Sequence, residues 1–304
     1  MPTWWDPTGE LAPKVPSRRA VRAVKYGFVI PSGAIDDIVA LTVEAERAGW
    51  DGAFTWDGMD IEMAGPMSDP WVALAAMALR TERVTIGAIV TPVSRRRPWK
   101  LARETVTVDH LSGGRLVVPV GLGATDDGGF GKVGEPTDRR TRAELLDEGL
   151  EILTGLWGGE PFAYQGRHHR FDAMRFVPPP VQRPRIPIWV VGAWPRERSM
   201  ARAARYDGVM PSKQGPGGSY GEPLTPNDIR ELRAWLADRR HADTPCDIIL
   251  EGETPADDPA AAAAKVQPLA EAGATWWIEG LWDAMHNPGR VRRRIVAGPP
   301  KPIV

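Results

Sequence analysis

Short β-forming runs alternate with helical patterns along most of the chain, and this alternation restricts the fold more than any other sequence feature. Eight runs have the length and apolar character of strands, at residues 25–30, 52–56, 84–90, 116–120, 186–191, 208–210, 247–250 and 275–278. Helical patterns follow them, at residues 35–48, 69–79, 98–111, 139–157, 197–205, 226–239, 259–272 and 288–296. Eight strand–helix repeats predict an α/β fold, the (β/α)8 TIM barrel, and 304 residues suit a single barrel domain.

A doubly wound nucleotide-binding fold also alternates strands and helices. Its first strand is followed by the pattern G-x-G-x-x-G, whereas this sequence reads IPSGAI at that point.

Two segments fall outside the barrel pattern. Residues 1–23 are rich in proline and charge and predict an N-terminal arm before a barrel at 24–304. The arm would lie on the surface or against a partner subunit, or form a mobile tail. Residues 158–185 predict an insertion between strands four and five, outside the barrel or acting as a lid.

Charge and cysteine content narrow the class of protein. Lys and Arg number 38 against 39 Asp and Glu, so the net charge near -1 argues against a dedicated nucleic-acid binder. The single cysteine, Cys246, excludes an internal disulfide and suits a reducing cytoplasm. The first residues lack a signal-peptide core, and no apolar run reaches membrane-spanning length. We expect a cytoplasmic protein without nucleic-acid or membrane partners.

The ends of the strands indicate where chemistry should occur, because barrel enzymes build their sites there. These ends are apolar, aromatic and rich in glycine: Ile30-Pro31, Trp56-Asp57-Gly58-Met59, Val90-Thr91, Gly121-Leu122-Gly123, Gly192-Ala193-Trp194, Met210-Pro211-Ser212-Lys213, Glu251-Gly252 and Glu279-Gly280. Four of these residues can do acid–base work: Asp57, Lys213, Glu251 and Glu279.

Metal and nucleophilic chemistry find little support in the sequence. None of the five histidines falls at a predicted strand end, so we expect no metal site. No G-x-S-x-G motif supports a serine hydrolase.

A barrel mouth with glycines and aromatic residues suits a planar cofactor instead. Gly192, with Arg196 and Arg198 at the following helix start, could bind its phosphate; a plain turn with solvated arginines is the alternative.

Several stretches resemble one family when taken in order. They are IGAIVTPVSRRRPWKLARETVTVDHLSGGRLVVPVGLG, RRTRAELLDEGLEILTGLW, FVPPPVQRPRIPIWVVGAW and AARYDGVMP, which together span most of the chain. This order is similar to that of the luciferase-like flavin-dependent oxidoreductases, which include bacterial luciferase, flavin monooxygenases and enzymes that use the deazaflavin F420.

The resemblance implies a (β/α)8 barrel with reduced FMN or F420 across its mouth. It implies a backbone bulge, often a cis peptide, at Ile89-Val90-Thr91 behind the flavin ring. Further cofactor contacts that it implies are Gly121, Gly123, Ala124 and Thr125 beside the ring and Gly192, Ala193 and Trp194 at the phosphate-bearing tail.

The sequence departs from the family at strand two, where many relatives have a histidine after an acidic residue. Here Asp57 matches the acidic position and Gly58 replaces the histidine. Asp57 is therefore the catalytic candidate, with loop capping as the alternative role. Trp56 and Met59, with Trp194, suggest an apolar substrate wall, although core packing would explain them equally.

These features predict an FMN-dependent monooxygenase acting on a small organic substrate, with a flavin reductase as a candidate partner. An F420-dependent hydride-transfer enzyme and a non-catalytic flavin-binding relative are the alternatives.

Arg95, Arg96 and Arg97 form either a site for the anionic tail of F420 or a solvated loop. Tryptophans in the arm and at Trp276-Trp277 suggest a homo-oligomer.

Overall fold

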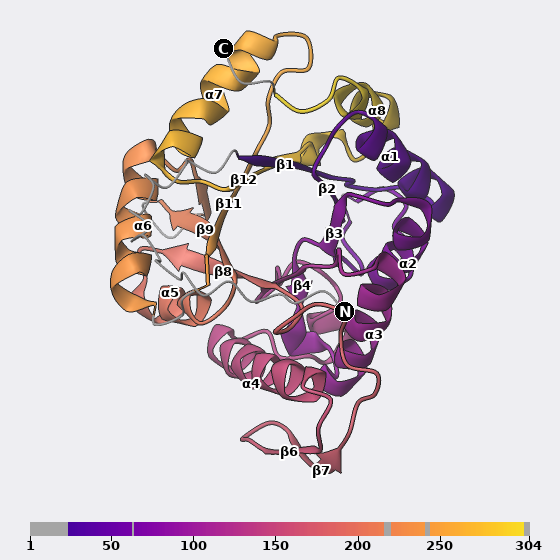
Figure 1. Cartoon of the computed structure of the whole chain (residues 1–304), viewed down its shortest axis with the longest axis vertical. Coiled ribbons are helices and arrows are strands. Elements are labelled where there is room, and N and C mark those ends of the chain that lie inside the picture. The colour runs from indigo at the N-terminus through magenta and orange to yellow at the C-terminus, as the bar shows by residue number, and fades with distance from the viewer. Residues whose placement is uncertain (1–23, 63, 216–219, 241–243, 301–304) are drawn as a thin grey trace, which may run out of the picture.

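Parallel strands wrap into a nearly closed barrel with helices around its outside (Figure 1). The computed structural model describes residues 24–62, 64–215, 220–240 and 244–300, so the predicted arm at 1–23 lies outside the described residues. The strands are β1 (Lys25–Val29), β2 (Gly52–Thr55), β3 (Thr85–Ala88), β4 (Thr91–Pro92), β5 (Val118–Gly121), β6 (Phe162–Gln165), β7 (Arg170–Met174), β8 (Ile188–Trp194), β9 (Gly208–Gln214), β10 (Tyr220–Glu222), β11 (Asp247–Gly252) and β12 (Trp276–Gly280).

The barrel predicted from the alternation is confirmed by the strand order, β3-β2-β1-β12-β11-β9-β8-β5-β4. Strands β3 and β4 together occupy the place of the third predicted strand. Strand β3 pairs with β2 and β4 pairs with β5. A parallel bridge between Ile86 and Leu116 joins the two ends of the sheet, and the backbone N–H of Val117 donates to the Ile86 carbonyl at 2.9 Å.

The eight α-helices of the described chain lie close to their predicted positions. They are α1 (Ile35–Arg47), α2 (Pro70–Arg80), α3 (Pro98–Ser112), α4 (Arg139–Trp157), α5 (Glu197–Ala204), α6 (Pro226–Arg239), α7 (Pro259–Ala272) and α8 (Pro288–Val296). Proline opens five of them because it lacks the backbone N–H that the first turn leaves unbonded. Asp69 caps α2 by accepting hydrogen bonds from the backbone N–H groups of Trp71 and Val72.

Aromatic side chains fill the barrel interior at the N-terminal ends of the strands. Trp189 and Trp276 lie early in β8 and β12, and their ring centroids are 5.2 Å apart. Phe54 packs against both. These rings belong to a buried cluster that also contains Ile89, located farther toward the carboxyl ends. Because the lower half is packed, a ligand can enter only from the end where the strands finish.

The insertion forms an antiparallel hairpin, β6–β7, rather than irregular chain. It lies outside the barrel beyond α4, at the bottom of Figure 1. Phe171 of the hairpin packs edge-on against Trp99 of α3 with ring centroids 5.9 Å apart. The structure therefore supports the outside position that was one of the two predicted for this segment.

The predicted end of the sixth strand at residue 210 was wrong. Strand β9 continues to Gln214 and folds back as the antiparallel strand β10. Strand β8 likewise extends through Gly192 and Trp194, which were expected to follow the strand. Glycine and proline disfavour strands locally, but pairing of β8 with β9 up to Trp194 and Lys213 overrides that preference.

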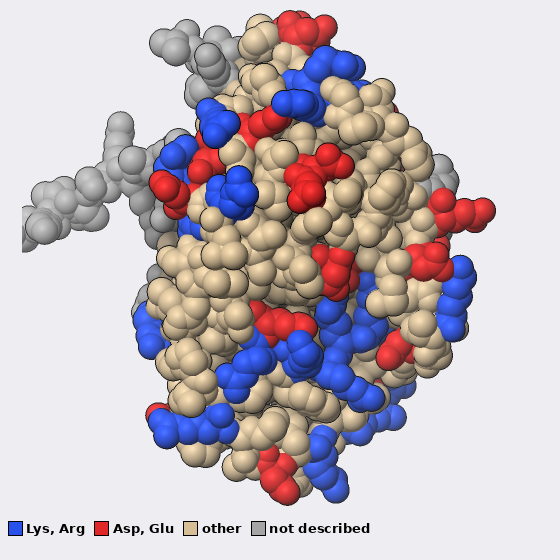
Figure 2. All heavy atoms as spheres, turned by 90° about the vertical axis from the view of Figure 1, so that its right-hand side faces the viewer, with Lys and Arg blue, Asp and Glu red and all other residues tan. Residues whose placement is uncertain are grey.

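Basic and acidic side chains lie side by side on the face that carries α1, α2 and α3. Figure 2 shows Lys and Arg gathered in the lower half of this face, with Asp and Glu among them. The mixture of both signs on this face agrees with the balanced total charge of the chain.

Candidate functional site

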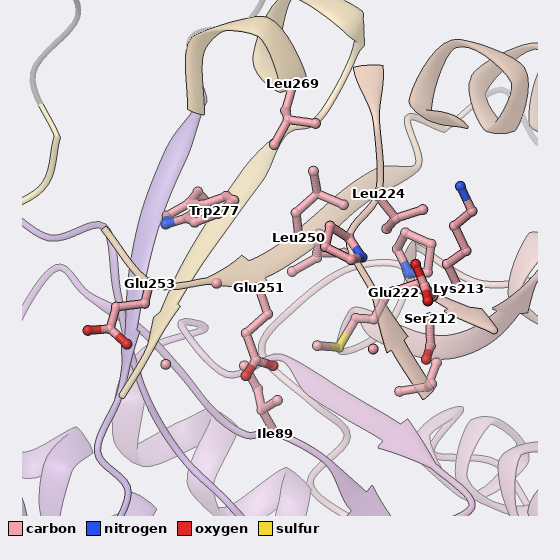
Figure 3. Close-up of a pocket in the computed structure, with 18 of the residues that line it drawn as sticks. Ile89, Ser212, Lys213, Glu222, Leu224, Leu250, Glu251, Glu253, Leu269 and Trp277 are labelled. Atoms are coloured by element: carbon pink, nitrogen blue, oxygen red, sulfur yellow. The ribbon is translucent and has the colours of Figure 1, made fainter. Parts of the chain in front are cut away.

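A cavity of about 650 Å³ opens at the carboxyl ends of β9, β11 and β12 (Figure 3). Its inner wall comes from the barrel interior and includes Ile89, Val90, Val191, Met210 and Ile249. Its outer wall lies beside α6 and α7 and includes Leu224, Leu250, Leu269 and Trp277. The cavity therefore connects the mouth of the barrel with the layer between the sheet and these two helices.

The cavity exists because β9 and β11 separate after a short contact. They pair only at Asp247 with Gly208 and at Ile248 with Val209 among the described residues. Beyond that point β9 stays on β8 and β11 stays on β12. The hairpin β9–β10 and the end of β11 then form opposite walls, lined by Ser212 and Lys213 on one side and Glu251 and Gly252 on the other.

Glu251 is the acidic residue that faces the inner part of this cavity. Figure 3 shows its carboxylate directed toward Ile89, whereas Glu253 points away to the other side. Its Oε1 accepts a hydrogen bond from the indole N–H of Trp282. Glu251 is exposed to the cavity, but surrounding protein raises its pKa by desolvation, and the Trp282 bond offsets part of that rise.

Gly280 leaves the space in which this pair meets. A Cβ at position 280 would lie 2.8 Å from Glu251 Oε1 and 2.9 Å from Trp282 Nε1. Any larger residue at 280 would therefore displace the carboxylate or the indole. Trp282 was missed in the sequence because it lies beyond the strand end, in a 3-10 turn at Trp282–Ala284.

The other two acid–base candidates at strand ends have internal partners. Lys213 Nζ lies 2.8 Å from Asp228 Oδ2, and Asp228 also takes part in the capping box of α6. Glu279 is fully buried, accepts a hydrogen bond from the Thr254 hydroxyl at 3.0 Å, and pairs with Arg294 at 3.4 Å. Glu279 does not line the cavity, so of these two only Lys213 reaches it.

The predicted cis peptide is present between Ile89 and Val90, and both residues line the cavity. Gly121 lies beside them, and a Cβ there would approach Val90 Cγ2 and Val191 Cγ2 at 3.3 Å each. Thr91 is fully buried in β4. The structure thus places two of the predicted cofactor contacts, Ile89 and Val90, on the inner wall, and Gly121 lies next to Val90 but outside the cavity lining.

The predicted contacts for the phosphate-bearing tail pair with β9 beside this cavity but do not line it. A Cβ at Gly192 would meet Met200 Sδ at 2.5 Å, which shows that this glycine allows β8 to pack on α5. The backbone N–H of Ala193 donates to the Ser199 hydroxyl at 3.0 Å. Trp194 is buried. None of the three lines the cavity.

Gly123, Ala124 and Thr125 follow β5 and also lie outside the cavity lining. Gly123 has φ +75°, and its carbonyl accepts a hydrogen bond from Arg142 at 2.9 Å. A Cβ there would lie 2.8 Å from Pro92 Cβ. The loop after β5 is thus held against the end of β4, next to the inner wall.

Asp57 is buried between two arginines. Its Oδ2 accepts a hydrogen bond from Arg96 Nε at 2.7 Å, and its Oδ1 lies 3.2 Å from Arg95. Arg95 also binds Asp127 and stacks over Phe130 with the guanidinium carbon 5.1 Å from the ring centroid. The side chains of Asp57 and Arg95 are 2% and 1% exposed.

The two alternatives for the arginine run thus both fail at Arg95, which neither faces solvent nor is available for a cofactor tail. Arg96 is partly buried on Asp57, and Arg97 is exposed. A charged triplet in sequence does not reveal internal partners, because Asp57 and Asp127 lie far from it along the chain.

The two predicted substrate residues, Trp56 and Met59, lie in different surroundings. Trp56 is half-buried and packs edge-to-face on Trp282, with ring centroids 5.5 Å apart. Trp56 thereby contacts a cavity-lining residue. Met59 is 56% exposed on the loop after β2, away from the cavity lining. Trp276 and Trp277 are 2% and 3% exposed, so they give no support for an oligomer contact.

Within the described chain, no group of three or more potential ligands could hold a metal ion. None of the described helices has both the length and the apolar character needed to cross a membrane.

A profile for the family described as luciferase-like monooxygenase matches residues 15–297, nearly the whole chain. The chain belongs to the luciferase-like monooxygenase family. The family resemblance and the barrel fold expected from the sequence are both confirmed by this match and by solved structures.

Among curated relatives, an uncharacterized protein of Mycobacterium tuberculosis is 37% identical over 137 residues, covering 45% of this chain and 47% of that protein. An F420-dependent glucose-6-phosphate dehydrogenase of Microbacterium testaceum is 29% identical over 186 residues, covering 59% of this chain and 54% of that protein. The chain thus spans about half the length of the curated relatives it matches.

Two solved structures share the fold. The monooxygenase RslO1 of Streptomyces bottropensis superposes with a TM-score of 0.71 at 22% identity, covering 90% of this chain and 98% of that one. The oxygenating constituent of 3,6-diketocamphane monooxygenase of Pseudomonas putida, in complex with FMN, gives 0.68 at 14% identity, covering 92% and 99%.

Proposed function

We propose that this luciferase-like protein is a flavin-dependent monooxygenase that uses reduced FMN on a small organic substrate. The observation that carries the proposal is the cavity of about 650 Å³ at the carboxyl ends of the barrel strands. Its volume falls within the roughly 300–1,000 Å³ typical of ligand pockets. Apolar walls with few charged groups suit a planar ring that brings its own chemistry.

The residues at the inner wall fit such a ring. Gly121 has no side chain to crowd Val90 and Val191, since a Cβ there would lie 3.3 Å from both, so the two valines can keep their places in the cavity wall. Ile89 and Val90 form the apolar backing. Reduced FMN bound at this wall would supply the redox chemistry, which is its own reaction with O₂. The protein's part is to hold the ring, exclude water with its apolar walls and orient the substrate.

F420-dependent hydride transfer is the second candidate, and the F420-dependent curated relative favours it. Thr91, Gly123, Ala124, Thr125, Gly192, Ala193 and Trp194 remain proposed contacts for the rest of either cofactor. Asp57 remains a proposed catalytic residue, and Trp56 and Met59 remain proposed substrate contacts. A non-catalytic flavin-binding protein is the rival from another class.

Titration of the purified protein with reduced FMN and with reduced F420, followed by cofactor oxidation with and without O₂, separates these readings. We expect saturable binding of reduced FMN and O₂-dependent oxidation. Oxidation of reduced F420 coupled to reduction of an organic probe, without O₂, would establish the second candidate instead. Tight binding without turnover of any probe would favour the non-catalytic reading, and binding of neither cofactor would overturn the proposal.

A variant with a larger side chain next to the inner wall tests whether the cofactor ring binds there. Gly121→Leu should weaken cofactor binding at least tenfold, because the new side chain would push Val90 and Val191 of the inner wall into the cavity. Gly131→Leu is the matched control, since a Cβ there meets only Thr137 Cγ2 at 3.8 Å. Equal affinities for both variants and the wild type would place the cofactor elsewhere.

We also propose a cytoplasmic location, a flavin reductase partner for the FMN reaction and a homo-oligomer. The outward face of α2 supports self-association, because Val72 and Leu79 are 64% and 66% exposed and Ala75 and Ala76 lie between them. Leu79→Glu should lower the molecular mass measured by light scattering. An unchanged mass would remove α2 from the interface.

A further inference from the structure

We propose that Glu251 is the proton-transfer residue of the cavity, where it exchanges a proton with the O–H or N–H group of a mostly apolar substrate. This inference rests on the proposed function, because the cofactor at the inner wall would act on the same substrate. The residues that hold Glu251 for this role are Trp282 and, behind it, Trp56.

The first argument is the unequal bonding of the two carboxylate oxygens. Oε1 accepts the indole N–H of Trp282. Oε2 has no hydrogen-bond partner within the described part of the chain, and the carboxylate is directed toward Ile89 at the inner wall (Figure 3). One oxygen therefore fixes the group, and the other is available to a substrate beside the apolar backing.

The second argument is the placement of this carboxylate among apolar side chains. Ile89, Met210 and Ile249 line the cavity around it. Desolvation by such neighbours disfavours the charged form, so the neutral acid and the carboxylate are closer in free energy than they are for a fully solvated glutamate. A group in this condition can take a proton from a substrate and return it to cavity water.

The third argument is that no side chain at position 58, where many relatives have a histidine, can perform this role. A Cβ at Gly58 would collide with the indole ring of Trp56. That ring is fixed by its own N–H, which donates to the Pro31 carbonyl at 2.5 Å. Its edge-to-face contact with Trp282 has an interplanar angle of 87°. The two indoles thus occupy the space beside β2 and support Glu251 from β11.

The fourth argument concerns the other charged groups that face the cavity. Lys213 on β9 is paired with Asp228, and Lys265 on α7 donates to the Glu253 carbonyl at 2.7 Å. Glu253 pairs with Arg290. Glu222 on β10 lies on the opposite wall from Glu251. Desolvation and the Trp282 bond, rather than a neighbouring charge, account for the shift at Glu251.

The chemical step is a balanced proton transfer. As the substrate reacts, its O–H or N–H bond breaks, the electron pair stays on the substrate oxygen or nitrogen, and the proton forms a bond to Glu251 Oε2. The neutral acid then loses that proton to cavity water, which restores the carboxylate. In the proposed function O₂ is the oxidant, and it accepts the two electrons that the substrate loses together with the two that reduced FMN brings.

The test compares wild type, Glu251→Gln and the control Glu222→Gln, whose residue also lines the cavity. Infrared difference spectra over a pH titration, recorded without cofactor, should show a carboxylic-acid band that titrates above the ordinary glutamate range. We expect Glu251→Gln to lose this band and Glu222→Gln to retain it. A band that persists in Glu251→Gln would overturn the proposal.

A second measurement uses the cofactor-loaded protein with benzyl alcohol and benzylamine as probes. Glu251→Gln should bind the cofactor like wild type but lower probe turnover about 100-fold or more, the usual range for a lost general acid–base group. It should also abolish the corresponding limb of the pH profile. Unchanged turnover and pH profile would overturn the inference while leaving the proposed function intact.

Trp282→Phe tests the positioning role. Loss of the indole N–H removes a bond that stabilises the carboxylate, so the infrared midpoint of Glu251 should move to higher pH. A purely structural tryptophan would leave that midpoint unchanged. Because the infrared arm needs no cofactor, a protein that binds neither FMN nor F420 would contradict the proposed function alone.

Discussion

At the scale of single residues, Asp57 shows how a position at a strand end can serve stability. Its carboxylate joins Arg95 and Arg96, and Arg95 in turn joins Asp127. Burial by itself raises the pKa of Asp127, but hydrogen bonds from Arg95 and from the backbone of Gly129 lower it overall. This network fixes the loops after β2, β4 and β5 around the mouth of the barrel.

Removing the acid from this network should be costly. Asp57→Ala leaves the buried Arg95 with one carboxylate, and breaking a buried ion pair typically costs about 3–5 kcal/mol. We expect a loss of that order in the free energy of unfolding, measured by urea denaturation. Asp60→Ala is the control, because Asp60 and its partner Lys132 are 55% and 74% exposed and such pairs contribute about 0–1 kcal/mol.

A second variant at this position tests the catalytic role proposed for Asp57. Asp57→Asn keeps the shape of the side chain, so turnover can be compared in protein that remains folded. Loss of turnover with little loss of stability would support a catalytic role. Loss of stability alone would leave Asp57 as the anchor of the arginine pair.

At the scale of elements, Glu148 of α4 ties the insertion hairpin to the barrel. Its carboxylate accepts hydrogen bonds from the backbone N–H groups of Arg167, His168 and His169, at 2.6, 3.1 and 2.9 Å. Burial alone raises the pKa of Glu148, but these bonds outweigh it and the pKa is lowered. A lowered pKa means that the stabilisation is complete above the ordinary glutamate pKa and is lost as the pH falls through the folded value.

We therefore expect Glu148→Ala to loosen β6–β7 without unfolding the barrel. Hydrogen bonds to charged groups contribute about 1.5–3 kcal/mol, so amides in 162–174 should exchange at least tenfold faster in hydrogen–deuterium exchange. Acid should produce the same change in wild type. Glu160→Ala is the control, because Glu160 is 80% exposed and lies 3.9 Å from Arg175. Equal exchange in both variants would contradict the assignment.

At the scale of the whole molecule, the separation of β9 and β11 opens a cavity at the carboxyl ends of the barrel strands. Its lower half is packed with indole and phenyl rings, and its upper half is the cavity. A ligand bound in the upper half contacts several strands at once. Binding should therefore stabilise the folded barrel as a unit rather than one loop.

Thermal unfolding checks this expectation. A cofactor that binds only the folded state adds about 2.7 kcal/mol when its free concentration is 100 times Kd. We expect reduced FMN to raise the Tm of wild type in a concentration-dependent way and to leave the Tm of Gly121→Leu nearly unchanged. A rise of equal size in both proteins would indicate binding away from the inner wall.

The sequence by itself determined the barrel and the end of the barrel that carries the site. Period-2 and period-3.6 patterns, proline at helix starts and glycine after strands depend on neighbouring residues, so they can be recognised in one chain. The cis peptide at Ile89-Val90 was expected from the family resemblance. The insertion was located correctly, although its hairpin was not foreseen.

The tertiary structure alone decided which residues at that end can act. Glu251, Trp282 and Trp56 come from different parts of the chain, and only folding brings them together. Asp57 and Glu251 look alike in sequence, but one lies between two arginines and the other faces an apolar cavity. The chemistry of a carboxylate depends on its surroundings in space, and those surroundings are set by strands that are distant along the chain.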